Sequence, residues 1–149
     1  MKFWDSSAVI PLLVPELMSE STQKLFEGDP VIVAWWATEI ECTSAIARRQ
    51  RQGKLREELA LEAFRRLSAL RAGWHEVESS EEIRESAKRL LRVHDLRTAD
   101  ALQLAAGFFV AEALPSTLEF ISLDEVLLAA SRREGFPSPS RLYDRLRCH

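Results

Sequence analysis

The sequence predicts an α/β fold: a single domain over residues 1–149 with a central parallel sheet and helices on both faces. Short apolar runs typical of buried strands alternate along the chain with longer amphipathic segments. A helix between two strands returns the chain to the same edge of the sheet, which gives parallel strands joined by right-handed crossovers. The hydrophobic fraction of 46% is that of a globular domain with a real core.

The first half of the chain supplies two strands and three helices. Residues 31–35 form a continuous run rich in β-branched side chains, as in a strand buried on both faces. Pro15, the turn at 28–30 and Gly53 supply stop signals for the helices. We expect strands at 3–4 and 31–35, and helices at 8–14, 16–27 and 37–52.

The second half continues the alternation. Apolar residues recur at helical spacing between 55 and 71, before Gly73, and Ser80 is a suitable cap for the next helix. Gly135 ends the last periodic segment. We expect strands at 74–77 and 118–123, and helices at 55–71, after Ser80, at 98–113 and at 125–134.

Composition excludes several classes of protein. A net charge of −3 argues against coating nucleic acid by charge alone, although sixteen of the twenty basic residues are arginines, which bind phosphate in a bidentate manner. The longest uncharged apolar run, 104–111, is too short for the ~20 residues of a membrane span. Cys42 and Cys148 form no disulfide framework, so we expect a cytoplasmic protein with Cys42 in the core and Cys148 in the tail.

Four acidic residues fall where a predicted strand stops or a predicted helix begins. Asp5 follows the first strand and Asp124 follows the last one, while Glu41 and Asp100 lie in the first turns of helices. Ligands of parallel α/β sheets bind outside the carboxyl ends of the strands. The four acids are therefore candidates for one site at that edge.

Each acid also has a local explanation. Asp5 and Asp124 suit helix N-caps, and an acid in a first turn, such as Asp100, is favoured by the helix dipole. Thr38-x-x-Glu41 matches a capping box. These explanations do not account for Asp100 as the lone charge of an apolar helix. Carboxylates desolvated together repel one another unless a cation holds them.

The available ligands limit the choice of cation. The histidines at 75, 94 and 149 lack the spacing of a zinc site. Oxygen-only ligands favour Mg²⁺ or Mn²⁺. A carboxylate-held magnesium ion usually acts on phosphate esters.

Four segments together carry a resemblance to a known family. In chain order they are WDSSAVIPLL, TEIECTSAIARR with its Glu seven residues before an Arg (Glu41 and Arg48), LRTADALQLAAG and FISLDEVLLAAS. The set resembles the PIN domain, specifically the VapC-type toxin ribonucleases of prokaryotic toxin–antitoxin pairs, over nearly the whole chain. Two features depart from the pattern: Ser122 stands where Thr is usual, and the tail after Gly135 lacks an apolar final strand.

The resemblance implies a PIN-like domain with a metal-dependent endoribonuclease site. It implies Mg²⁺ or Mn²⁺ as cofactor, with Glu39 as an alternative to Glu41 in a shifted register. The implied metal ligands and catalytic residues are Asp5, Glu41, Asp100 and Asp124, and the supporting hydroxyls are those of Ser7, Thr98 and Ser122.

The resemblance also implies partners: an RNA substrate, a small VapB-like antitoxin that occupies the active-site groove, and a second copy of the chain in a homodimer. Arg48 and Arg97 are candidate RNA-phosphate contacts, as are Arg89, Arg92 and other arginines of 47–56. The apolar stripe between 55 and 70 is a candidate surface for the dimer or the antitoxin.

Other functions fit less well. A haloacid-dehalogenase-like enzyme needs Asp-x-Asp at the first strand, where position 7 is Ser. A receiver domain needs a lysine after a late strand, but the lysines are at 2, 24, 54 and 88. A non-catalytic PIN-like module that binds RNA or an antitoxin-like partner remains the alternative.

Overall fold

The computed structural model describes the backbone of residues 1–147 and the side chains of residues 1–144, so Cys148 and His149 of the tail lie outside the described residues. Its centre is a four-stranded sheet in the order β3-β2-β1-β4, with all neighbours parallel. The strands are β1 (Lys2–Trp4), β2 (Ile32–Trp35), β3 (His75–Val77) and β4 (Phe120–Ile121). The predicted α/β class and parallel sheet are confirmed.

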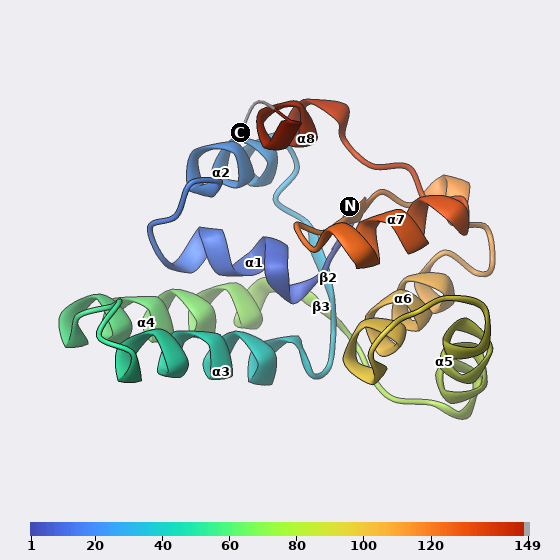
Figure 1. Ribbon diagram of the computed structural model, residues 1–149, viewed down its shortest axis with the longest axis horizontal. Helices are drawn as coiled ribbons and strands as arrows, with labels where there is room; N and C mark the ends of the chain where they lie inside the picture. Colours follow the sequence, from blue (N-terminus) through green and yellow to red (C-terminus); the bar gives the residue numbers. More distant parts are fainter. Residues whose placement is uncertain (148–149) are drawn as a thin grey trace.

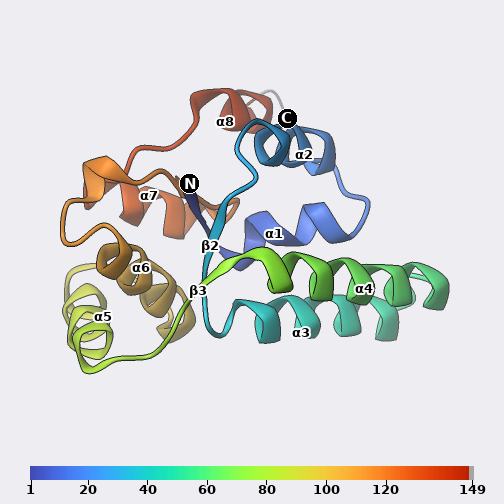
Figure 2. The ribbon, with the colours of Figure 1, turned by 180° about the vertical axis from the view of Figure 1, so that it is seen from behind.

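Helices cover both faces of this sheet (Figure 1). α1 to α4 lie on one side of it and α5 to α7 on the other, and α3 and α4 extend side by side away from the sheet (Figure 2). The helices are α1 (Ser6–Leu13), α2 (Ser19–Gly28), α3 (Thr38–Arg51), α4 (Glu57–Gly73), α5 (Glu81–Val93), α6 (Thr98–Val110), α7 (Glu125–Arg133) and α8 (Ser140–Arg147), with a 3-10 turn η1 (Pro115–Thr117).

Two hydrophobic cores result, one on each face of the sheet. Successive side chains of a strand point to opposite faces, so Phe3 packs in the core under α5 and α6 while Trp4 packs in the core under α1, α3 and α4. Cys42 is fully buried in the latter core, as predicted. Among the described residues, no helix is long and apolar enough to cross a membrane.

Several predicted helix boundaries are confirmed by their caps. Ser80 Oγ accepts a hydrogen bond from the Ile83 amide at 3.2 Å and begins α5. Gly53 and Gly135 follow α3 and α7 with φ angles of +72° and +99°, a conformation that glycine adopts without a Cβ clash.

Other boundaries differ from the prediction. α2 begins at Ser19, three residues after the expected position 16, and α6 ends at Val110 because Glu112 and Ala113 adopt positive φ angles of 51° and 61°. The predicted strand 118–123 contributes only Phe120–Ile121 to the sheet.

The tail and the apolar stripe differ in how far the structure agrees with their sequence. As the tail sequence indicated, no further strand follows β4 in the described part of the chain; the tail instead forms the helix α8, which was not predicted. Leu55, Ala63 and Leu67 are buried in the core of this domain. Leu70 packs against this core and Leu59 is 37% exposed, so most of the stripe between 55 and 70 packs inside the fold and is not available to a partner.

Candidate active site

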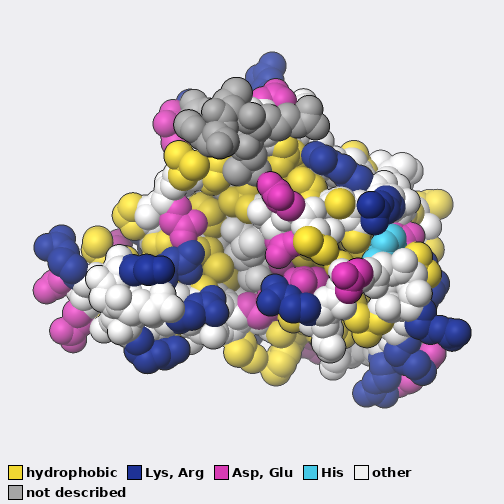
Figure 3. Space-filling view, in the orientation of Figure 1, with side chains coloured by type: hydrophobic (Ala, Val, Ile, Leu, Met, Phe, Trp, Pro, Cys, Tyr) yellow, Lys and Arg dark blue, Asp and Glu magenta, His cyan; other side chains and the backbone are white. Residues whose placement is uncertain are grey.

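All four predicted acids line one cavity of about 580 Å³ at the carboxyl ends of the strands. Asp5 directly follows β1 and Asp124 follows β4, while Glu41 and Asp100 come from the first turns of α3 and α6. Acidic side chains gather near the centre of the face in Figure 3, with basic side chains to both sides. The topology thus brings together residues from four separate parts of the chain.

Asp5 is the most buried of these acids, with 3% of its surface exposed. Its Oδ2 accepts hydrogen bonds from Ser7 Oγ at 2.5 Å and from Ser122 Oγ at 2.9 Å. Burial raises the pKa of Asp5; the hydrogen bonds from the two serines partly oppose this effect, and the charge of Asp100 adds to it. Ser7 and Ser122, two of the three predicted supporting hydroxyls, therefore both contact the Asp5 carboxylate.

Glu41 is held by two residues that sequence reasoning missed. Ser6 Oγ donates to Glu41 Oε2 at 3.0 Å, and Gln103 Nε2 donates to Glu41 Oε1 at 2.9 Å. Burial raises the pKa of Glu41, and the charges of Asp5 and Asp100 raise it further against these hydrogen bonds. The sequence did contain a signal for Gln103: it lies three residues after Asp100 in an apolar helix, and therefore on the same helix face as that predicted site acid.

The capping-box interpretation of Glu41 is wrong. Ala37 is the N-cap of α3 without a side-chain bond, and Thr38 Oγ1 instead accepts from Gln103 Nε2 at 3.0 Å. The alternative residue Glu39 does not line the cavity, and its carboxylate lies 3.0 Å from Arg71 Nε. Of the two candidates, the structure therefore places Glu41 in the cavity.

Asp100 and Asp124 complete the acidic wall. Asp100 Oδ2 lies 3.5 Å from Arg97 Nε; burial raises the pKa of Asp100, as does the charge of Asp124, while Arg97 opposes both. Asp124 caps α7 by accepting from the Leu127 amide at 2.9 Å, so its local explanation is also correct. Among the described residues, Arg97 is the only cation within ion-pair distance of these four carboxylates.

The cavity therefore collects more negative charge than its neighbours neutralise. Within the described residues, no group of three or more His, Cys, Asp or Glu side chains is close enough to form a ready metal cage. Mg²⁺, however, keeps several water ligands and is usually bound through only one or two carboxylates. The oxygen-only donors and the raised pKa values of three acids fit Mg²⁺ or Mn²⁺.

The predicted basic residues divide into two groups. Arg48 lines the cavity, is exposed and makes no ion pair with the described residues, whereas Arg97 lines it beside Asp100 with 84% of its side chain exposed. Arg49 pairs with Glu16, and Arg89 pairs with Glu134 at 2.9 Å. Arg48 and Arg97 are thus the two predicted basic side chains that line the cavity.

Thr98, the third predicted hydroxyl, is not brought into the site. It is exposed at the start of α6 and does not line the cavity. The N-cap of this helix is Arg97, which makes no side-chain capping bond. The structure gives Thr98 no contact with the acids that it was expected to support.

Solved structures share this architecture. VapC20 of Mycobacterium tuberculosis, a sarcin–ricin loop cleaving toxin, superimposes with a TM-score of 0.66 at 19% identity, over 92% of this chain and 97% of its own. PAE2754 of Pyrobaculum aerophilum gives a TM-score of 0.65 at 22% identity, over 99% of this chain and 90% of its own. No protein-family model and no curated protein sequence matches the chain. The chain therefore has the PIN-like fold of these two proteins, as its four motifs predicted.

Proposed function

We propose that this protein is a Mg²⁺- or Mn²⁺-dependent endoribonuclease of the VapC toxin type, which hydrolyses RNA phosphodiester bonds. The observation that carries the proposal is the single cavity lined by Asp5, Glu41, Asp100 and Asp124 on a PIN-like fold. The toxin VapC20, which has the same fold, cleaves the sarcin–ricin loop, an RNA. Carboxylates gathered at the carboxyl ends of parallel strands suit metal-assisted phosphoryl chemistry.

We assign the roles of the residues from the family resemblance, and their contacts support this assignment. Asp5 and Asp100 would hold the metal ion, with Glu41 and Asp124 as further oxygen donors. When bound, Mg²⁺ or Mn²⁺ supplies the activation of water and the stabilisation of phosphate charge. The serines bonded to Asp5 fix its carboxylate before any ligand arrives, which lowers the cost of ordering the site.

The arginines at the cavity wall would orient the RNA. Arg48 has no ion pair to give up within the described residues, and Arg97 is mostly exposed, so both can contact backbone phosphates. The partners in this proposal are RNA, a small VapB-like antitoxin and a second copy of the chain, and its location is the cytoplasm. The family resemblance supports these assignments.

A cleavage assay tests the proposal. The purified protein is expected to cut RNA with Mg²⁺ or Mn²⁺ and to lose this activity in EDTA. Asp5→Asn, Asp100→Asn and Glu41→Gln should each reduce cleavage by about 100-fold or more. Glu39→Gln is the matched control because this residue lies on the same helix but outside the cavity, and it should retain activity. Full activity in Asp5→Asn or Asp100→Asn would remove the proposal.

The alternative is a non-catalytic PIN-like module that binds RNA or a protein partner. The lack of a ready three-residue metal cage among the described residues favours it. Calorimetric titration with Mn²⁺ separates the two functions. A nuclease is expected to bind Mn²⁺ in the cavity and to lose this binding in Asp100→Asn. A non-catalytic module is expected to bind RNA without binding Mn²⁺.

A further inference from the structure

The hydroxyl of Tyr143, from α8, is bound to both backbone polar groups of Ser122. It donates to the Ser122 carbonyl oxygen at 2.9 Å and accepts from the Ser122 amide at 3.3 Å. Both residues are buried, with 5% and 0% exposure. Removing the hydroxyl would leave a buried N–H and a buried C=O without these partners.

These bonds occupy the outer edge of β4, where a further strand would pair. The inner edge of this segment is bonded to β1 through Glu119 and Ile121 carbonyls. On the outer edge, the Phe120 amide donates to the Pro137 carbonyl at 3.0 Å, and Ser122 is bound to Tyr143. The tail after Gly135 thus supplies the partners that an edge strand would otherwise provide.

Ser122 connects this edge to the acidic cavity. Its Oγ donates to Asp5 Oδ2 at 2.9 Å and accepts from the Asp124 amide at 3.1 Å. The backbone position of Ser122 therefore decides where its hydroxyl meets Asp5. Tyr143 contributes to fixing that position from the opposite side.

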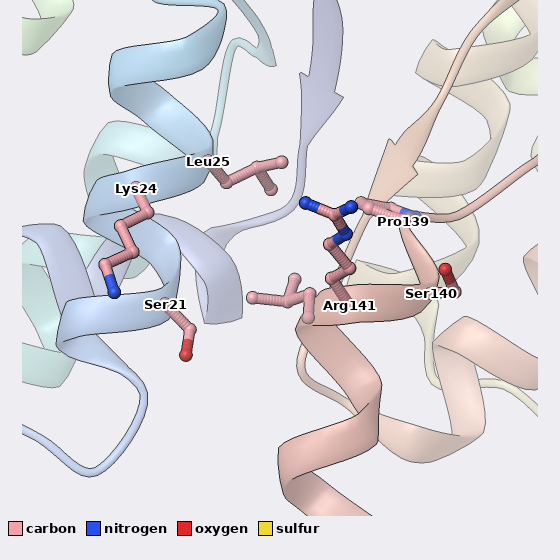
Figure 4. Close-up of a pocket in the computed structure, with 7 residues that line it drawn as sticks. Ser21, Lys24, Leu25, Pro139, Ser140 and Arg141 are labelled. Carbon is pink, nitrogen blue, oxygen red and sulfur yellow. The ribbon is translucent and has the colours of Figure 1, made fainter.

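Leu142 and Tyr143 anchor α8 in the hydrophobic core. The Arg132 guanidinium lies 5.0 Å from the centre of the Tyr143 ring, and Leu142 is buried. Between α2 and α8, however, there is a cavity of about 600 Å³, into which side chains of both helices project (Figure 4). The hydroxyl of Tyr143 is thus a specific polar link between α8 and the site.

We infer that Tyr143 is a positioning residue for the metal site, acting through Ser122 on Asp5. The inference rests on the proposed function, because it assigns α8 a part in holding the carboxylate that would bind Mg²⁺ or Mn²⁺. Tyr143 itself does not line the cavity.

Tyr143→Phe removes the hydroxyl and keeps the ring. We expect it to fold with a Tm lowered by about 2–8 °C, and to bind Mn²⁺ about 3- to 10-fold more weakly by calorimetry. This loss is smaller than the roughly 10- to 100-fold typical of residues bonded directly to a metal ligand, because Tyr143 acts through Ser122. The kcat for RNA should fall while KM stays unchanged, because Arg48 and Arg97 are untouched. Thr22→Val is the matched control: it removes a buried hydroxyl bonded only within α2 and its N-cap, and should keep wild-type Mn²⁺ affinity.

The chain contains one tyrosine, which permits a direct measurement on the unmutated sequence. Protein labelled with 3-fluorotyrosine gives a single ¹⁹F resonance, and titration with Mg²⁺ should shift it with the same midpoint as binding measured by calorimetry. The shift should be absent in Asp5→Asn. This measurement decides the question if Tyr143→Phe does not fold.

The outcomes separate the two proposals. Wild-type Mn²⁺ affinity in folded Tyr143→Phe, or a ¹⁹F resonance indifferent to Mg²⁺ in a protein that binds Mg²⁺, would overturn the positioning role and leave the nuclease assignment intact. A wild-type protein that binds neither ion would overturn both.

Discussion

Replacing Asp100 with asparagine is expected to leave the metal-free protein at least as stable as wild type and to reduce its stabilisation by Mn²⁺ by more than half. Burial and the charge of Asp124 raise the pKa of Asp100, so the folded state disfavours its ionised form. The opposing ion pair is weak because 84% of the Arg97 side chain is exposed. At neutral pH without metal, the neutral amide removes a repulsive charge from the cavity.

Bound metal should make wild type more stable than Asp100→Asn. An ion present at one hundred times its Kd stabilises the folded state by about 2.7 kcal/mol. For a domain of this length, about 1 kcal/mol corresponds to a Tm change of about 2–4 °C, so wild type should gain about 5–11 °C. The Asp100→Asn variant should gain less than half of this shift because one of the principal carboxylates is gone.

Differential scanning fluorimetry at pH 7.5, with EDTA or with Mn²⁺, measures both effects. Asp95→Asn is the matched control, because it makes the same substitution at an exposed acid outside the cavity. The reasoning is refuted if wild type and Asp100→Asn respond equally to Mn²⁺, or if the variant is several degrees less stable than wild type in EDTA.

Three further predictions concern the same cavity. The pKa of Glu41 is raised in the folded state, so this residue stabilises the fold at pH values below the ordinary carboxyl range, and this stabilisation is lost as pH rises through the folded-state pKa. Glu41→Gln has no such pH dependence. The metal-free Tm of Glu41→Gln, compared with that of wild type, should therefore rise in favour of the variant from pH 4 to 8. Gln103→Leu removes a donor to Glu41 and should weaken Mn²⁺ binding about 10-fold by calorimetry, and an unchanged affinity would contradict the role of this contact. Arg48→Ala should raise KM for RNA and leave Mn²⁺ affinity unaltered, and the opposite pattern would place Arg48 at the metal instead of the phosphate.

The acids were predictable because their chemistry is tied to local position. Asp5 and Asp124 follow short apolar runs that indicate buried strands, and parallel topology then places both acids at the same edge of the sheet. The contact of Glu41 with Gln103 spans 62 positions along the chain, so a capping box, which needs only Thr38 and Glu41, was the nearer explanation. Local pattern cannot show which hydrogen-bond partner prevails.

The tail was unpredictable for a related reason. α8 is short and mostly polar, and isolated helices of this length are not stable in water. Its place is set by tertiary contacts, above all the bonds between Tyr143 and Ser122. For α4, the helical period of the apolar stripe was predicted correctly. The period alone, however, does not show whether the apolar face packs against this domain or against a partner.

The central claim is that folding gathers carboxylates from four parts of the chain into one divalent-ion site. Anomalous scattering from a crystal soaked in Mn²⁺ tests it most directly. The account predicts an anomalous peak in the cavity within coordination distance of the Asp5 and Asp100 carboxylates, absent from crystals of Asp100→Asn. A fully occupied Mn²⁺ site elsewhere on the protein, with no peak in this cavity, would contradict it.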